Sequence, residues 1–331
     1  MSRIFVIGDI HGCYDELMTL TQKVNLQEED WLISVGDILD RGGKSKEVYE
    51  YFRNRPNSKV LIGNHERKHI NNVLSYAQEI VKLQFGEVYT ELLAWLSKQD
   101  YYFETPETII VHAAFEHDQP LQQQREDVLS GSTSGEKYLE KKYTETPRWK
   151  DHYRGEKTII YGHHVVGDTP EKHGNTIGID TAACHGGYLT AIELPGFHIH
   201  QVKAARDYWK EEQVNWQVPV LKAKDWENMT FDMVRKQLNK LAYIEVPEVR
   251  AFLSGVEKEM MELQGMYTKI IEGIVAFVER LGEERFLEEA NKYSFKAFLF
   301  KSRANNLKVE DLEKSLNTMG KVKALVREIM E

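Results

Sequence analysis

The chain has little cysteine and no long apolar run. Its 331 residues include two cysteines, Cys13 and Cys184, which are too few for a disulfide framework and are not spaced as zinc ligands. No apolar stretch approaches the roughly 20 residues of a membrane-spanning helix, and no basic leader with an apolar core precedes the first expected strand. We therefore expect a reducing, cytoplasmic location and no membrane partner.

Acidic residues outnumber basic ones, and this imbalance is confined to one part of the chain. Lys and Arg number 43 against 52 Asp and Glu, which gives a formal net charge of −9. Residues 201–331 carry 22 residues of each sign, so the whole deficit lies in residues 1–200, which also hold all twelve histidines. Because all the histidines lie there, we expect catalysis upstream of residue 201. Divalent cations would neutralise much of the clustered carboxylate charge, so the net charge is weak evidence against binding polyanions. Nucleic acid stays an alternative partner, although the net negative charge of the chain does not favour it.

Runs rich in Val and Ile alternate with amphipathic segments at the start of the chain. Residues 3–8, 31–35 and 59–62 are expected to be strands of β-α-β units, because each leads into a Gly-containing turn and a helical pattern. Helical periodicity covers residues 66–98, and the polar residues 116–150 are expected to form a mobile cap or substrate loop. Five later runs predict further strands at 108–112, 157–161, 175–179, 188–193 and 197–203. The predicted fold class is therefore α/β.

The later part of the sequence is helical in pattern. Residues 203–226 lack clean periodicity and are interpreted as a crossover packed on the first domain. Pro247 then opens a helix with apolar positions every three or four residues, and Gly282 is a natural C-cap. We predict a catalytic domain over residues 1–203 and an all-helical C-terminal domain over residues 204–331. The role of these helices is unknown, and they are expected to bind a partner or to self-associate.

Three ordered clusters follow the first three expected strands. Residues 8–12 are Gly-Asp-Ile-His-Gly, residues 36–42 are Gly-Asp-Ile-Leu-Asp-Arg-Gly, and residues 63–66 are Gly-Asn-His-Glu. Each cluster alone is usually only a turn, but the ordered set is far more specific. His112 and His163 end two later strands and add imidazoles. Together these segments indicate the metal- and phosphate-handling core of a two-metal phosphoesterase.

The oxygen and nitrogen donors of these clusters suit a pair of divalent ions. Two ions about 3.5–4 Å apart can hold a phosphoryl group and generate an attacking hydroxide, and Asp37 can bridge them. Such a mixed donor set favours Mn over Ca, with Fe, Zn or Ni as alternatives. The predicted metal ligands are Asp9, His11, Asp37, Asn64, His112 and His163.

The same clusters supply an acid and charge clamps. His65 directly follows a predicted ligand, so on an extended turn it points away from the metal and toward the leaving oxygen. Asp40 can hold His65 in the required tautomer, and Arg41 is suited to bidentate contact with phosphate oxygens. A second arginine, Arg154 or Arg148, precedes the last histidine-bearing strand.

These motifs resemble those of the calcineurin-like metallophosphoesterases, and within them the phosphoprotein phosphatase branch that includes phage and bacterial serine/threonine phosphatases. The resemblance covers residues 1–200. It implies a four-layer α/β/β/α sandwich and the six metal ligands named above. It also implies that His65 is the acid, Asp40 its partner and Arg41 a phosphate contact.

A second resemblance concerns residues 147–191, which are similar to the phosphatase domain of bacterial polynucleotide kinase-phosphatases. Those enzymes act on RNA ends. The similarity implies that Arg154 is the second phosphate clamp and that Asp180 joins the site. The chain departs from the family where Val-His-Ala-Gly ends in Ala114 and where His164 replaces the usual Thr, and either departure is expected to narrow substrate choice.

We therefore interpret the sequence as a dinuclear-metal-dependent phosphomonoesterase that hydrolyses by direct attack of metal-bound hydroxide. The leading function is a serine/threonine-type protein phosphatase acting on phosphorylated protein or another phosphomonoester. The alternatives are a nucleic-acid end phosphatase or phosphodiesterase, and a diadenosine tetraphosphate hydrolase, a class that tends to lack the Asp equivalent to Asp40. A non-catalytic, metal-free scaffold is the remote alternative.

Overall fold

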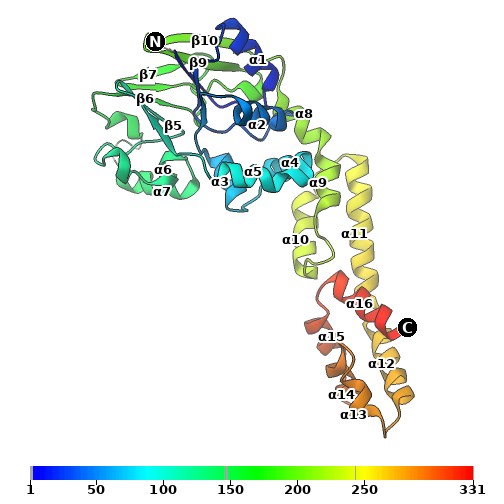
Figure 1. The fold of residues 1–331 in the computed structure, drawn as a ribbon. Coiled ribbons are helices and arrows are strands. Elements are labelled where there is room, and N and C mark those ends of the chain that lie inside the picture. Colours follow the sequence, from blue (N-terminus) through cyan, green and yellow to red (C-terminus); the bar gives the residue numbers. More distant parts are fainter. Residues whose placement is uncertain (1–2, 145, 147, 243, 331) are drawn as a thin grey trace. The chain divides into compact units, whose positions relative to one another are not determined.

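The computed structural model describes residues 3–144, 146, 148–242 and 244–330. Pro147, the first residue of the stretch that resembles the polynucleotide kinase-phosphatases, lies outside them. The chain divides into two compact units, Met1–Val220 and Leu221–Glu331 (Figure 1). The first unit thus includes residues 204–220, and the division falls within the 203–226 segment interpreted as a crossover. The functional boundary at residue 203 stays a prediction.

Within the described part of the first unit, the strands form two five-stranded sheets (Figure 1). The first sheet has the order β10-β9-β1-β2-β3 and the second the order β4-β5-β6-β8-β7. β1, β2 and β3 are parallel, as are β5, β6 and β8, so the carboxyl ends within each set share one edge. The bounds are Ile4–Ile7 (β1), Trp31–Ser34 (β2), Ser58–Val60 (β3), Tyr102–Glu104 (β4), Thr108–Val111 (β5), Thr158–Tyr161 (β6), Glu171–His173 (β7), Thr176–Gly178 (β8), Tyr188–Leu194 (β9) and His198–Lys203 (β10).

Alternate side chains of the central strands enter different cores, as a layered fold requires. On β1, Val6 lies in the core between the two sheets, while Phe5 packs with the helices that cover the first sheet. On β6, Ile160 lies in the same central core, while Ile159 packs with the helices that cover the second sheet. The layers are therefore α/β/β/α, and the predicted fold class is confirmed.

The helices of the first unit confirm one prediction and correct another. Residues 66–98 are largely helical, as expected. The segment from 116 to 150 is not simply a loop, because it contains α6 and α7, which pack on the second sheet through Val128 and Leu139. Residues 126–142, which span these two helices, are called the cap segment below. The short edge strands β4 and β7 were not expected. The helical bounds are Tyr14–Lys23 (α1), Ser45–Asn54 (α2), Asn64–Ile70 (α3), Tyr76–Phe85 (α4), Gly86–Val88 (η1), Tyr89–Leu96 (α5), Leu121–Gln123 (η2), Glu126–Leu129 (α6), Thr133–Lys142 (α7), Trp149–Asp151 (η3), Ala183–His185 (η4) and Tyr208–Asn215 (α8).

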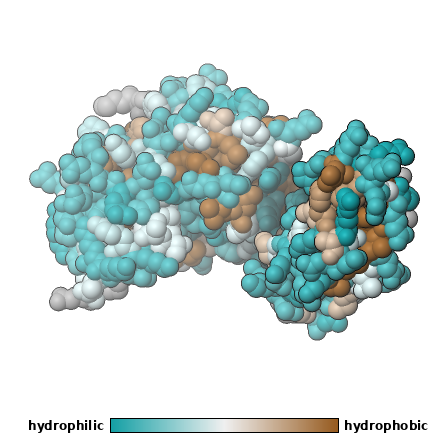
Figure 2. All heavy atoms as spheres, turned by 90° about the horizontal axis from the view of Figure 1, so that it is seen from below, coloured by the Kyte–Doolittle hydropathy of each residue, from teal (hydrophilic) through white to brown (hydrophobic). Residues whose placement is uncertain are grey.

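The named elements of the second unit are helices, joined by an isolated bridge between Thr230 and Thr318, but the long predicted helix is divided. It breaks near Met266 into α11 and α12, and Gly282 ends α12 with a φ of +68°. Figure 2 shows hydrophobic surface on this unit, where Met261 and Leu287 are 60% and 64% exposed. None of the described helices is long and apolar enough to cross a bilayer. The bounds are Gln217–Ala223 (α9, across the division), Phe231–Leu241 (α10), Pro247–Gly265 (α11), Tyr267–Leu281 (α12), Phe286–Ala290 (α13), Lys296–Arg303 (α14), Val309–Ser315 (α15) and Met319–Met330 (α16).

The central core predicts a contrast between two isoleucines. Ile160→Ala is expected to lower the free energy of unfolding by about 2–5 kcal/mol, because Ile160 is fully buried between the sheets. Ile199→Ala removes the same atoms from a side chain that is 54% exposed on β10, and we expect a loss below about 1 kcal/mol. Urea unfolding followed by circular dichroism measures both values. Equal losses would contradict the layered core.

Candidate active site

The predicted site residues gather where strands of both sheets end. Three segments leave the carboxyl ends of β1, β2 and β3, and three leave the ends of β5, β6 and β8. This edge of parallel strands is where α/β proteins collect ligand-binding side chains. The residues brought together are Asp9, His11, Asp37, Asp40, Arg41, Asn64, His65, His112, His163 and Asp180.

Several of these residues adopt a left-handed backbone. The φ angle is +46° at His11, +49° at Asp37, +70° at Asp40, +65° at Arg41 and +68° at His163. In residues with a Cβ this conformation costs free energy and persists only where the surrounding contacts hold it. The strain concentrates in the turns that present the predicted site residues.

Asp37 lies between two groups of donor atoms. Its Oδ2 is 3.6 Å from Nε2 of His11, and its Oδ1 is 3.5 Å from Nε2 of His112. Burial alone would raise the pKa of Asp37, but the imidazoles of His112 and His65 hold it below its ordinary value. The carboxylate therefore stays charged and presents one oxygen to each group, as a bridging ligand must.

Asn64, His112 and His163 form one donor group with Asp37. Oδ1 of Asn64 lies 3.2 Å from Nε2 of His112 and 3.1 Å from Nδ1 of His163. Burial lowers the pKa of His112 to about 3, so its imidazole is neutral at pH 7. Nδ1 of His112 donates to the carbonyl of Val35 at 3.2 Å, which leaves the lone pair of Nε2 free for a cation.

The other donor group has His11 on the second oxygen of Asp37, and the carboxylates of Asp9 and Asp180 are close enough to Asp37 to interact with its charge. Burial and the carboxylates of Asp180 and Asp37 raise the pKa of Asp9 well above its ordinary value. Burial also lowers the pKa of His11 well below its ordinary value, so this imidazole is neutral. Arg41 supplies one positive charge to these three crowded carboxylates, and a divalent cation would supply more.

Two glycines leave the space that these carboxylates occupy. A Cβ at Gly162 would lie 2.0 Å from Oδ1 of Asp9, and a Cβ at Gly63 would lie 2.2 Å from Oδ1 of Asp37. Any larger residue would therefore displace a carboxylate. The oxygen donors and neutral imidazoles fit two divalent ions of the Mn, Fe or Zn type.

His65 lies beside the donor groups, and Asp40 holds its ring. Nδ1 of His65 is 2.6 Å from Oδ2 of Asp40, which leaves Nε2 facing the site. Asp40 also accepts hydrogen bonds from Nε2 of His69 at 3.1 Å and from the side-chain amide of Gln78. Burial alone would raise the pKa of Asp40, but His69 and His65 lower it, so the carboxylate stays charged.

Arg41 joins the two parts of the site. Its Nη1 is 3.2 Å from Nε2 of His11, and its Nη2 is 3.1 Å from Nε2 of His65. The guanidinium thus lies between a candidate metal ligand and the candidate acid. Phosphate oxygens bound there could accept two parallel hydrogen bonds from it.

Three buried residues that the sequence analysis did not assign organise the site. Glu66 accepts backbone N–H groups from both strand-end loops, at 2.8 Å from Asp37 and 3.1 Å from Gly63. A Glu in the first turn of a helix often reaches back to the N-cap, and that signal could have indicated its role. His69 and Gln78 bind a carboxylate 29 and 38 residues away, and no local pattern shows such a pairing.

The two candidates for a second arginine are placed differently. Arg154 is exposed and donates to the carbonyl of the preceding residue at 2.8 Å, so the structure does not bring it to the other site residues. Arg148 instead lines a cavity that also contains His163. Asp180 is buried beside Asp9, where the second resemblance had placed it.

Comparison with known proteins identifies the family. The profile described as calcineurin-like phosphoesterase matches residues 2–184. The chain belongs to the calcineurin-like phosphoesterase family. The phosphoesterase has relatives in Anoxybacillus flavithermus (28% identity over 62% of this chain and 96% of the relative) and Bacillus subtilis (29% over 61% and 95%), both named bis(5'-nucleosyl)-tetraphosphatase PrpE (asymmetrical). The crystal structure of a candidate diadenosine tetraphosphatase shares the fold, with a TM-score of 0.51 and 23% identity over 61% of this chain and 94% of that chain.

Family membership confirms two of the predictions. The chain is a metal-dependent phosphoric ester hydrolase, and the calcineurin-like assignment made from its motifs is correct. The family implies divalent metal ions, and the donor groups around Asp37 fit them.

Gly162→Ala tests the donor group that contains Asp9. The new Cβ would lie 2.0 Å from Oδ1 of Asp9, so we expect this phosphoesterase variant to bind less metal than the parent chain. Elemental analysis after dialysis against Mn²⁺ measures the metal content. Gly255→Ala is the matched control, because nothing lies within 4 Å of its added Cβ. Full metal content in the Gly162 variant would show that the donor group is not a metal site.

Proposed function

We propose that the phosphoesterase uses two divalent ions, with manganese as the native metal. The observation that supports this proposal is the position of Asp37, whose two oxygens face separate donor groups beside Arg41 and His65. When bound, the ions supply a nucleophilic hydroxide and neutralise charge on the phosphate. The residues that would hold them are Asp9, His11, Asp37, Asn64, His112 and His163.

The side chains of the site have separate roles in hydrolysis. Arg41 binds phosphate oxygens and orients the phosphorus. In the structure Nε2 of His65 accepts a hydrogen bond from Arg41. With Arg41 turned to the phosphate, His65 carries a proton on Nε2 and delivers it to the leaving oxygen, while Asp40 holds Nδ1–H and stabilises the imidazolium before transfer. Burial raises the pKa of Cys184 to about 12, so the thiol beside Arg41 is a poor nucleophile and a covalent phosphoenzyme is not part of the proposal.

The proposed substrate is a nucleoside polyphosphate such as a bis(5'-nucleosyl) tetraphosphate. The two PrpE relatives support this choice, because the chain covers 96% and 95% of their lengths. The protein phosphatase that the sequence analysis put first is the second candidate, favoured by the full Gly-Asp-x-x-Asp-Arg-Gly motif at residues 36–42. The nucleic-acid end phosphatase stays an alternative.

A comparison of three substrates tests the proposal. With Mn²⁺ present, we expect kcat/KM for diadenosine tetraphosphate to exceed the values for a phosphoserine peptide and for a 3'-phosphorylated RNA by at least about tenfold. Anion-exchange chromatography should show AMP and ATP as the products. A faster reaction on the phosphopeptide would favour the second candidate, and no turnover of any phosphate ester would refute the two-metal proposal.

Replacement of the proposed acid should depend on the leaving group. We expect His65→Ala to reduce turnover of phenyl phosphate by about 100-fold or more, and that of p-nitrophenyl phosphate much less, since a poor leaving oxygen needs the proton most. Metal content should stay that of the parent chain. His198→Ala on exposed β10 is the control. Equal losses on both esters would argue against the acid role.

A further inference from the structure

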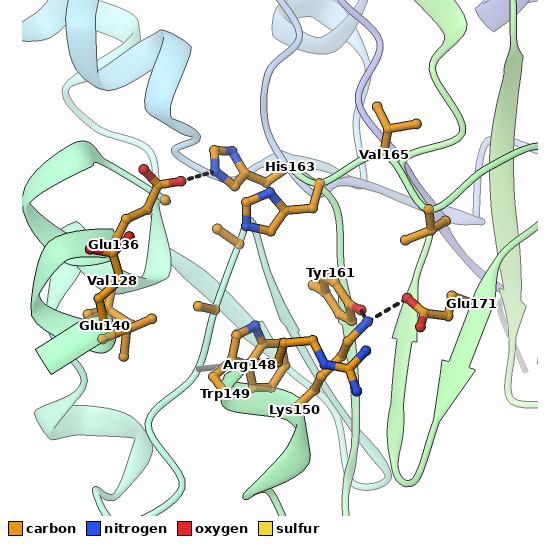
Figure 3. A pocket seen from close by; sticks show the side chains of 16 residues that line it. Val128, Glu136, Glu140, Arg148, Trp149, Lys150, Tyr161, His163, Val165 and Glu171 are labelled. Carbon is orange, nitrogen blue, oxygen red and sulfur yellow. Dashed lines mark hydrogen bonds and ion pairs between the residues drawn. The ribbon is translucent and has the colours of Figure 1, made fainter. Parts of the chain in front are cut away.

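A cavity of about 480 Å³ lies beside the proposed metal ligand His163 (Figure 3). Glu136 of α7 forms one side of it, Tyr161 at the end of β6 another, and Trp149 of η3 a third. We call it the aromatic pocket. Its volume lies within the range of sites that bind small molecules.

The inner wall of the aromatic pocket is apolar. Trp149 and Tyr161 meet edge to face with ring centroids 5.2 Å apart, and both are almost fully buried. Ala113, Val128 and Leu139 add further apolar side chains to the lining, with Val128 on the side of Glu136 (Figure 3). Such a surface favours a flat, uncharged group over a hydrated anion.

The cations at this pocket already have carboxylate partners. Arg148 pairs with Asp151 at 3.0 Å. Lys150 pairs with Glu171 at 2.5 Å (Figure 3). A phosphate group bound there would have to compete with these ion pairs. The rim therefore offers polar edges for hydrogen bonds and little unbalanced positive charge.

A second cavity of about 390 Å³ adjoins the first and differs from it in character. Its lining includes Lys68, the hydroxyl side chains at residues 132–134, and Arg67, which also lies 3.5 Å from the exposed carboxylate of Glu126. We call it the basic pocket. Both pockets share Gly131, Glu136 and His163. An apolar pocket and a basic, hydroxyl-rich pocket thus meet at a proposed metal ligand.

The departures from the family motifs fall in one of these two pockets. Ala114 and His164, noted in the sequence as unusual for the family, both line the aromatic pocket. Neither lines the basic pocket. The chain therefore differs from the family motifs at the apolar part of the site.

We propose that the aromatic pocket binds the nucleobase of a nucleoside polyphosphate while the phosphate chain runs past His163 into the basic pocket. This inference rests on the proposed phosphoester hydrolysis and specifies how its substrate is recognised. Bases stack on aromatic side chains, whereas phosphate oxygens accept hydrogen bonds from Lys, Arg and hydroxyl groups. A bare phosphate chain fills only the basic pocket, and phosphoserine itself carries no flat group to fill the aromatic pocket.

Competition against p-nitrophenyl phosphate turnover, in excess Mn²⁺, tests the assignment with ATP and inorganic tripolyphosphate as probes. In the parent chain the inhibition constant of ATP should be at least about tenfold lower than that of tripolyphosphate, because only ATP carries a base. This comparison needs no variant. Equal constants for the two probes would overturn the proposal.

Three Val→Trp variants then locate the base. Val165 lines the aromatic pocket, Val73 lines the basic pocket, and Val214 lies on α8 away from both; their side chains are all more than half exposed. Val165→Trp should raise the ATP constant by about tenfold and leave that of tripolyphosphate within about twofold, because it obstructs only the base. Val73→Trp should raise both constants, and Val214→Trp neither.

Other results would contradict the assignment in distinct ways. An equal rise for both probes in Val165→Trp would place the phosphate chain, not the base, in the aromatic pocket. A phosphoserine peptide that competes better than ATP and is weakened by Val165→Trp would make the pocket a peptide site. Base-dependent ATP binding without hydrolysis of diadenosine tetraphosphate would support the pocket assignment and refute the proposed substrate.

Discussion

Two loops of the site meet at one buried carboxylate, that of Glu66. One oxygen accepts the N–H groups of Asp37 at 2.8 Å and Gly63 at 3.1 Å, and the other accepts that of Ile38 at 3.0 Å. These bonds tie the loop after β2 to the start of α3. The N–H of His65 in turn donates to Oδ1 of Asp37 at 3.0 Å. The proposed bridging ligand and acid therefore share one anchor, and each buried N–H left without it would cost about 1–3 kcal/mol.

The carboxylates of the site fall into two kinds, and the difference explains their proposed roles. Asp40 receives hydrogen bonds from His65 and His69, which lower its pKa despite burial. Asp9 accepts the backbone N–H of His163 at 3.1 Å, but burial and the carboxylates of Asp180 and Asp37 raise its pKa. Carboxyl groups whose environments push their pKa values apart serve different tasks. Asp40 is satisfied by the protein and can orient an acid, whereas Asp9 needs a cation from outside.

The local pattern of the sequence predicted the central strands and the cluster around Asp37, because ligands at the ends of parallel strands follow from strand order alone. It could not predict the pairing of Gln78 with Asp40, which depends on how α4 packs against the loop after β2. The local pattern also could not decide between Arg148 and Arg154, because both precede β6. In the structure Arg148 directly precedes η3 and lines a pocket. We predicted a loop at the cap segment because most of its residues are polar. The few apolar residues that pack on the second sheet are too sparse to give a clear helical pattern.

His163 connects these parts of the molecule. Its Nδ1 faces Asn64 at 3.1 Å, and its Nε2 lies 3.2 Å from the carboxylate of Glu136 on α7. A carboxylate on the outer nitrogen of a metal-binding histidine fixes the tautomer and the ring orientation. The cap segment thereby contributes to the orientation of a proposed metal ligand as well as to the wall of both pockets. Because Glu136 does both, the position of the metal ligand and the shape of the space for the substrate are set by the same helix.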